Sequence, residues 1–145
     1  MADRDGKFKA GPDEAAAILN ALGEEAKNRI MDDIEKRDPN MAKLIDEKLV
    51  SLNDLVHMTP KMIMDFLREV KLDTFALALR MGSEELRKHI LGNVSSSIRQ
   101  DINDVLNGAP KPVGDVQEAV QSIMKTVSRL ISEGKIVLKD DDTLV

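Results

Sequence analysis

The stretch TPKMIMDFLREVKLDTFALALRMGSEELRKHILGNVSSSIRQDINDVLNG, residues 59–108, decides the fold, because boundary signals for short helices follow one another along it. The start signals are residues whose side chains can cap a helix: Thr59 before Pro60, Asp73, Ser83 and Ser95. The helices behind the last three are expected to end at Gly82, Leu91 and Asn107–Gly108. Helices this short cannot bury an apolar face alone, so the stretch predicts several helices packed against one another.

Helical spacing continues on both sides of this stretch. Downstream, a stiff loop over residues 109–114 precedes a helix expected over residues 115–133, which has a nearly regular apolar stripe. Upstream, three short helices are expected over residues 11–49, and their boundary signals are Gly11–Pro12, Gly23 and Asp38–Pro39. The alternation typical of strands occurs only in residues 135–139. The chain is therefore predicted to be all-α.

These boundaries predict a division of the chain into four parts. Residues 1–10 are expected to be a disordered N-terminus, 11–52 an armadillo-like three-helix module, 53–138 a larger helical domain and 139–145 an acidic tail. Residues 24–34 also echo residues 84–94 at an offset of 60, as expected of armadillo-like solenoids built from repeated helical units. Two capped amphipathic helices can share this pattern by chance, so both interpretations stay open.

The composition excludes several classes of function. The chain carries 21 Lys and Arg residues against 26 Asp and Glu, a net charge of -5 without a basic patch, which argues against nucleic-acid partners. Aromatic residues make up 2% of the chain, too few for base-stacking surfaces. The sequence has no cysteine and no signal peptide. No apolar run comes close to the length of about 18 residues that a membrane span needs. A soluble cytoplasmic protein without direct membrane insertion is expected.

No constellation of residues predicts catalysis, a metal or another cofactor. His57 and His89 lack the spacing of metal ligands, and surface or capping roles are expected for both. Serines 95–97 have no neighbouring histidine and precede an amphipathic run, so they are interpreted as a helix start rather than a nucleophile. The acidic run 140–142 lacks the pattern of a calcium loop. Met58, Met62, Met64 and Met81 either fill gaps in the core or line a groove for a partner.

The run from Leu52 to Leu138 contains motifs of a known family. Its segments LREV, ALAL, GSEELR and EGKIV begin at Leu67, Ala76, Gly82 and Glu133. Together with GPDEAAAILNAL and DPNMAKLIDEKL upstream, they make residues 11–138 resemble the second armadillo module and the C-terminal domain of the flagellar motor switch protein FliG. The resemblance implies a non-catalytic rotor component at the cytoplasmic face of the flagellar basal body. It also implies partners: FliM, full-length FliG through armadillo stacking, and the MotA stator loop.

The chain departs from the family pattern in its length and in its charges. The N-terminal ring-binding domain and the middle module with the Glu-His-Pro-Gln-Arg signature are not in these 145 residues. A fragment and a short paralogue are both possible; the start at Met1 and the poor match of residues 1–10 favour the paralogue. A FliG-derived adaptor outside the flagellum is the alternative function.

The family's charged ridge transfers to this chain only in part. Arg80 stands where the family has a lysine, and Asp104 stands at the first of its paired acidic positions. Val105 replaces the second acid, Ser97 replaces an arginine, and Pro112 falls where another arginine is expected. Helical spacing nevertheless places Ser97, Asp101 and Asp104 together on an outward face. The predicted partner-binding ridge is Arg80, Ser97, Asp101 and Asp104; a merely solvated charged face is the other interpretation.

A hinge between the two helical parts is also implied by the resemblance. The family's Met-Phe-x-Phe joint corresponds to Leu49, Val50, Ser51 and Leu52, where apolar character remains but both aromatic rings are missing. Because aromatic rings bury large areas, the joint is expected to be held differently in this chain.

Overall fold

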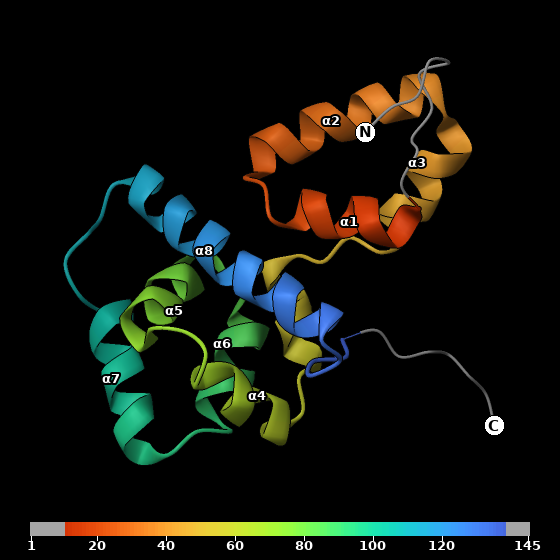
Figure 1. Cartoon of the computed structure of the whole chain (residues 1–145). Coiled ribbons are helices and arrows are strands. Elements are labelled where there is room, and N and C mark those ends of the chain that lie inside the picture. Colours follow the sequence, from red (N-terminus) through yellow and green to blue (C-terminus); the bar gives the residue numbers. More distant parts are fainter. Residues whose placement is uncertain (1–10, 139–145) are drawn as a thin grey trace. The chain divides into compact units, whose positions relative to one another are not determined.

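The computed structural model describes residues 11–138, which are mainly helical and contain no strand (Figure 1). This confirms the predicted all-α class. The predicted disordered residues 1–10 and acidic tail 139–145 lie outside the described residues. The chain forms two compact units, divided between Val50 and Ser51, whereas the sequence analysis placed the boundary after residue 52. We call them the N-terminal unit, described from residue 11, and the C-terminal unit, described to residue 138.

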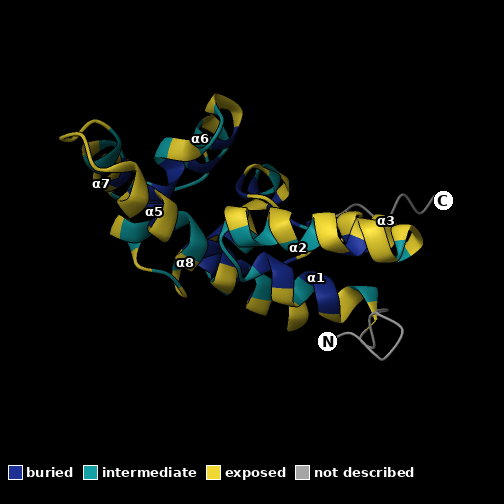
Figure 2. Cartoon of the chain, turned by 90° about the horizontal axis from the view of Figure 1, so that it is seen from above, coloured by how far each residue is buried: buried dark blue, intermediate teal, exposed yellow. Residues whose placement is uncertain are grey.

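The N-terminal unit consists of three helices. They are α1 (Pro12–Asn20), α2 (Glu24–Arg37) and α3 (Pro39–Asp46). α3 packs against both α1 and α2, and the shared core contains Ala15, Ala16, Leu19, Ile34, Ala42 and Ile45. In Figure 2, buried and exposed residues alternate around α1, as an amphipathic helix requires. Each helix therefore contributes one apolar face to a small common core.

Local capping signals set most boundaries of these helices. Pro12 and Pro39 lie in first turns, and the Asp38 side chain accepts a hydrogen bond of 3.2 Å from the Met41 amide. Gly23, a predicted boundary signal, is the extended residue immediately before α2, whereas α1 already ends at Asn20. A glycine is accepted at that position because an N-cap residue has non-helical backbone angles.

One ion pair and one buried side chain hold the end of this unit. Lys48 Nζ lies 2.8 Å from Asp13 Oδ1, and this side-chain hydrogen bond raises the pKa of Lys48. Asn20 is 8% exposed, and its Oδ1 accepts a hydrogen bond of 2.9 Å from the buried amide of Val50. The last helical residue of α1 thus fixes the last residue of the unit, 30 positions further along the chain.

The C-terminal unit contains five α-helices and two short 3-10 helices in its described part. They are η1 (Leu52–His57), α4 (Pro60–Leu67), α5 (Leu72–Ala78), η2 (Leu79–Met81), α6 (Glu84–Leu91), α7 (Ser96–Leu106) and α8 (Val113–Ser132). α5 has the most extensive packing, against α8 on one side and α7 on the other (Figure 1). Fully buried Phe66 and Phe75 form an edge-to-face pair with ring centres 5.1 Å apart, which joins α4 to α5.

Most helix starts of this unit follow the predicted signals. Side-chain oxygens of Thr59, Ser83 and Ser95 accept hydrogen bonds from the amides three residues later, at distances of 3.1–3.2 Å. Asp73 was wrongly predicted as a cap, since α5 begins at Leu72 behind Lys71; Asp73 lies in the first turn, where a negative charge is favourable.

The downstream half of the unit differs from expectation in small ways. The long helix α8 begins at Val113, two residues before its predicted start. Arg129 on α8 lies 3.2 Å from Glu69, and this hydrogen bond raises the pKa of Arg129. Residues 135–138 are not a strand, although Ile136 and Leu138 are buried and Val137 between them is exposed. The alternation in the sequence therefore reflects an extended segment packed on one side.

Replacing Asn20 by Ala is expected to lower the free energy of unfolding of the N-terminal unit by about 1–3 kcal/mol, because the buried Val50 amide loses its acceptor. The measurement is urea unfolding followed by the amide NMR signals of residues 11–50. Asn28→Ala, at an exposed position on α2, is the matched control. Equal stability of the two variants would show that the bond from Val50 contributes nothing.

Candidate functional site

The four residues of the predicted hinge lie where the two units divide. Leu49 is half-buried and packs against the core of the N-terminal unit, and the Val50 amide is bonded to Asn20. Ser51 is exposed and Leu52 is buried at the start of η1. Two of the four residues are thus held by the N-terminal unit and two begin the C-terminal unit.

A capping box holds the second pair. The Ser51 amide donates a hydrogen bond of 2.8 Å to Asp54 Oδ2, and the Ser51 hydroxyl lies 3.3 Å from the same oxygen. η1, which this box starts, packs against α6. Hydrogen bonding therefore changes from one unit to the other between Val50 and Ser51, and any hinge motion would be concentrated at that position.

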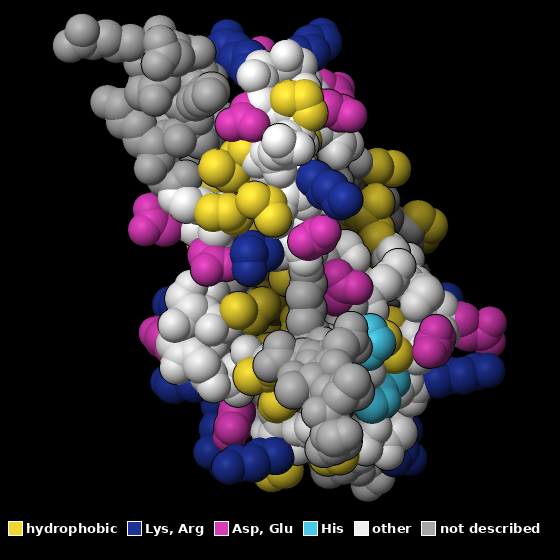
Figure 3. Space-filling model, turned by 90° about the vertical axis from the view of Figure 1, so that its right-hand side faces the viewer, with side chains coloured by type: hydrophobic (Ala, Val, Ile, Leu, Met, Phe, Trp, Pro, Cys, Tyr) yellow, Lys and Arg dark blue, Asp and Glu magenta, His cyan; other side chains and the backbone are white. Residues whose placement is uncertain are grey.

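The acidic members of the predicted ridge lie on the outer face of α7. Ser97, Asp101 and Asp104 are all exposed, whereas Ile102 on the opposite side is fully buried. Their spacing of four and three residues places them on one side of the helix. Figure 3 shows another face of the molecule, not that of α7, and there acidic and basic side chains are interspersed with hydrophobic ones.

Arg80 is not a free surface cation, because its guanidinium donates hydrogen bonds to backbone carbonyl oxygens. It lies in η2 and is half-exposed, and its Nε and Nη2 donate hydrogen bonds of 3.2 and 2.6 Å to the carbonyl oxygen of Val105. Its Nη1 donates a further bond of 3.0 Å to the carbonyl oxygen of Ala109. These carbonyls belong to the last turn of α7 and the segment behind it, where backbone acceptors are left open and carry partial negative charge. Arg80 therefore caps the end of α7.

Two more arginines make contacts of the same kind within this unit. Arg99 on α7 donates from Nε to the Leu91 carbonyl oxygen at 2.9 Å, at the end of α6. Arg87 on α6 donates a long bond of 3.5 Å to the carbonyl oxygen of Leu79, where α5 passes into η2. Sequence reasoning missed these three contacts, because an arginine 8 to 25 residues from its acceptor leaves no local pattern.

His89 and Met58 have structural roles in the C-terminal unit. His89 Nε2 lies 2.7 Å from the Met58 carbonyl oxygen, and this bond ties α6 to the end of η1. Met58 itself is buried, whereas Met64 and Met81 are more than two-fifths exposed. Among residues 11–138, no three His, Cys, Asp or Glu side chains gather as a metal site would require.

Replacing Arg80 by Ala is expected to lower the free energy of unfolding of the C-terminal unit by about 1–3 kcal/mol, because two carbonyl oxygens lose charged donors. Arg80→Lys keeps the charge but not the fork of donors, so it should recover only part of the loss. Thermal and urea unfolding measure the difference. Arg68→Ala, which removes an exposed arginine with a 3.9 Å ion pair, should change stability by less than about 0.5 kcal/mol. An Arg80→Ala variant as stable as the Arg68→Ala control would contradict the capping role.

Comparison with known proteins identifies the family. The model of the FliG C-terminal domain matches residues 32–138, more than half of the chain. The flagellar motor switch protein FliG of Thermotoga maritima is 33% identical over 129 residues, covering 88% of this chain and 38% of that protein. FliG of Bacillus subtilis is 27% identical over 139 residues, covering 93% and 41%. The chain thus spans about two-fifths of the length of these curated relatives.

Solved structures agree with the sequence comparison. A crystal structure of residues 86–343 of FliG from H. pylori superposes with a TM-score of 0.68 at 26% identity, covering 90% of this chain and 62% of that one. A second, of residues 116–343, gives a TM-score of 0.60 at the same identity, covering 92% and 60%. The helical fold and the family match together confirm the resemblance noted from the sequence, and the assignment to a family of motor switch proteins supports a non-catalytic role. This chain belongs to the FliG C-terminal domain family, and its fold is that of a flagellar motor switch domain.

Proposed function

We propose that the chain is a non-catalytic component of a flagellar rotor-switch assembly and that it acts by binding other switch proteins. The match of residues 32–138 to the FliG C-terminal domain carries this proposal. The proposed location is the cytoplasmic face of the flagellar basal body. No helix among the described residues has both the length and the apolar character needed to cross a bilayer, so the proposal is attachment through proteins rather than insertion.

The proposed partner-binding ridge is centred on the outer face of α7. Ser97, Asp101 and Asp104 are exposed there and free of the packing that buries Ile102. Arg80 borders this helix but donates to its terminal carbonyls, so the ridge offers acidic charge first and the Arg80 cation second. A complementary partner is therefore basic at this contact. FliM, full-length FliG and the MotA stator loop are the proposed candidates.

A second proposed contact is self-association through the N-terminal unit. Three short helices cover little of their own surface, and Ile18 and Leu44 remain 47% and 44% exposed. The buried face of α3 is made by Ala42 and Ile45, which leaves Leu44 outside the core. We propose that such exposed apolar side chains stack on a second copy or on full-length FliG, with residues 49–52 serving as the hinge.

The double variant Asp101→Asn, Asp104→Asn tests the ridge. Exposed charges act chiefly on association rate, so binding to the true partner should become about three- to tenfold slower at low salt and lose much of its salt dependence. The measurement is surface binding kinetics at two ionic strengths, with FliM, full-length FliG, a MotA loop peptide and a second copy of this chain as the panel. Folding stability should change by less than about 0.5 kcal/mol.

The control removes two other exposed acids from the same unit. Asp115→Asn with Glu118→Gln on α8 changes the net charge by the same amount away from α7. Equal kinetics for both double variants would mean that Asp101 and Asp104 are only a solvated face. If no flagellar protein of the panel bound the unaltered chain, the alternative of an adaptor outside the flagellum would replace the proposal.

A further inference from the structure

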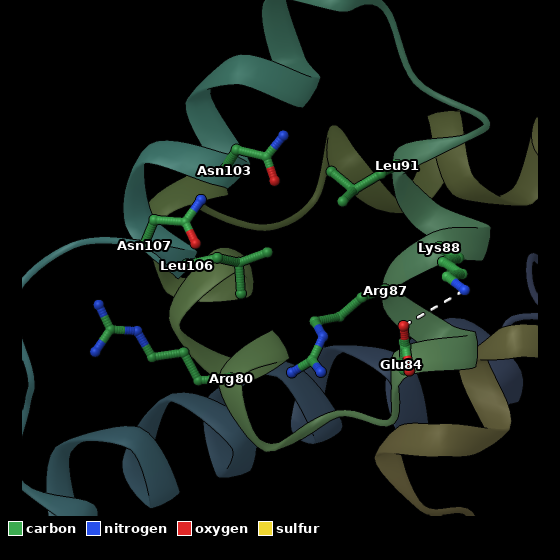
Figure 4. A pocket seen from close by; sticks show the side chains of 8 residues that line it. All are labelled: Arg80, Glu84, Arg87, Lys88, Leu91, Asn103, Leu106 and Asn107. Atoms are coloured by element: carbon green, nitrogen blue, oxygen red, sulfur yellow. Dashed lines mark ion pairs between the residues drawn. The ribbon is translucent and has the colours of Figure 1, made fainter.

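A groove of about 570 Å³ lies between α6 and α7, with η2 at one end (Figure 4). Arg87 and Leu91 enter it from α6, and Asn103, Leu106 and Asn107 extend from α7 toward α6. The groove is therefore a concave surface built from elements that the arginine caps hold together.

This groove lies on another side of α7 from Ser97, Asp101 and Asp104, and it shares only Arg80 with the proposed ridge. Successive residues of a helix are rotated by about 100°, which places Asn103 and Asn107 about 110° around α7 from the side formed by Ser97, Asp101 and Asp104. Fully buried Ile102 points in a third direction, into the core. One helix thus presents acids to solvent on one side and amides to a groove on another.

The charge of the groove is opposite to that of the chain. Three cations, Arg80, Arg87 and Lys88, and one acid, Glu84, line it, whereas the whole chain carries a net charge of -5. Arg80 directs its guanidinium to the end of α7, and Lys88 lies 3.4 Å from Glu84 in an exposed pair. Among residues 11–138, Arg87 has only the 3.5 Å bond to the Leu79 carbonyl oxygen, and within that part of the chain most of its five N–H donors are left for another acceptor.

The neighbours of Arg87 determine what could bind beside it. The side-chain amides of Asn103 and Asn107 provide neutral donors, and Leu91 and Leu106 provide apolar contact (Figure 4). A carboxylate of the ligand can accept hydrogen bonds from the Arg87 guanidinium and from the neighbouring asparagine amides. An aliphatic side chain of the ligand, next to that carboxylate, can pack against the two leucines. The C-terminal end of α7 at this groove carries partial negative charge, which opposes any anion. It opposes a doubly charged phosphate more strongly than a singly charged carboxylate, so the phosphate fits less well.

We propose that the α6–α7 groove binds an acidic segment of a partner protein, with a carboxylate on Arg87 and an adjacent aliphatic side chain against Leu91 and Leu106. The weak exposed pair between Lys88 and Glu84 opens at little cost, and Lys88 then adds a second positive charge at the rim. The inference goes beyond the proposed role of the ridge, since the ligand contacts Arg87, Leu91 and Leu106 rather than the exposed acids of α7, and the groove carries the opposite charge.

The test uses the full chain and two synthetic peptides. One is acetylated, amidated Gly-Ser-Asp-Leu-Glu-Asp-Leu-Ser-Gly, and the other has Asn and Gln in place of its acids. Titration to about 5 mM, above a Kd of about 1 mM, should shift the NMR signals of the Asn103 and Asn107 side-chain amides with the acidic peptide only. Arg87→Gln should weaken that binding about tenfold.

Two further variants keep the result interpretable. Arg68→Gln makes the same change of charge at the end of α4, outside the lining of the groove, and should leave the affinity unchanged. Asn103→Asp places a negative charge in the groove without touching Arg87 and should abolish binding even if Arg87→Gln proves poorly folded. The proposal is overturned by absent shifts, by equal shifts with both peptides, or by equal weakening in Arg87→Gln and Arg68→Gln.

Discussion

The arrangement of the C-terminal unit depends on how its short helices satisfy the carbonyl groups at their ends. Each α-helix leaves four such acceptors, and short helices have proportionally more of them. At the end of α6 all four are satisfied: Gly92 and Asn93 amides bond to Lys88 and Ile90, the Asn93 side chain to His89, and Arg99 to Leu91. In the last turn of α7, the Asn107 amide bonds to Asn103, and Arg80 and the Gly108 amide bond to Val105.

These contacts form a cycle. Arg80 of η2 caps α7, Arg99 of α7 caps α6, and Arg87 of α6 reaches back to Leu79 at the end of α5. Hydrogen bonds from a charged donor are generally stronger than those from a neutral one, and each bond here joins two different helices. The Arg80 bond is short and partly buried, the Arg99 bond is exposed and the Arg87 bond is long. The cycle supplements the packing of Phe66 against Phe75, which joins α4 to α5 but reaches neither α6 nor α7 by itself.

The cycle also separates the charges that are available for binding. The arginines of the cycle already donate hydrogen bonds within the fold. Arg80 uses its guanidinium to bond the carbonyl oxygens of Val105 and Ala109, so the same group is not free to bind a partner. Among the described residues, the side chains of Asp101 and Asp104 take no part in these hydrogen bonds, and both are exposed on α7. Arg87, with the longest of the three bonds, is the member of the cycle with most donors left for a ligand. The proposed ridge and the proposed α6–α7 groove thus both lie on α7.

Local chemistry was predictable from the sequence, and distant contacts were not. Thr59, Ser83 and Ser95 cap helices because their acceptor oxygens need only amides three residues away. Periodicity likewise placed Asp101 and Asp104 outside. The Ser51–Asp54 capping box is a local pattern that could have predicted the start of η1. It was not used, because η1 is too short to show an apolar stripe behind it. Arg80 and Asn20 find partners 25 and 30 residues away, so the helix end and the amide that they satisfy could not be inferred before the chain was folded.

Native-state hydrogen exchange on the unaltered chain and Arg99→Gln tests the cycle most directly. If the caps join α5, α6 and α7, amides in the three helices share one opening free energy, and Arg99→Gln lowers it by a similar amount in all three. Faster exchange confined to the last turn of α6, with α5 and α7 unchanged, would contradict the account.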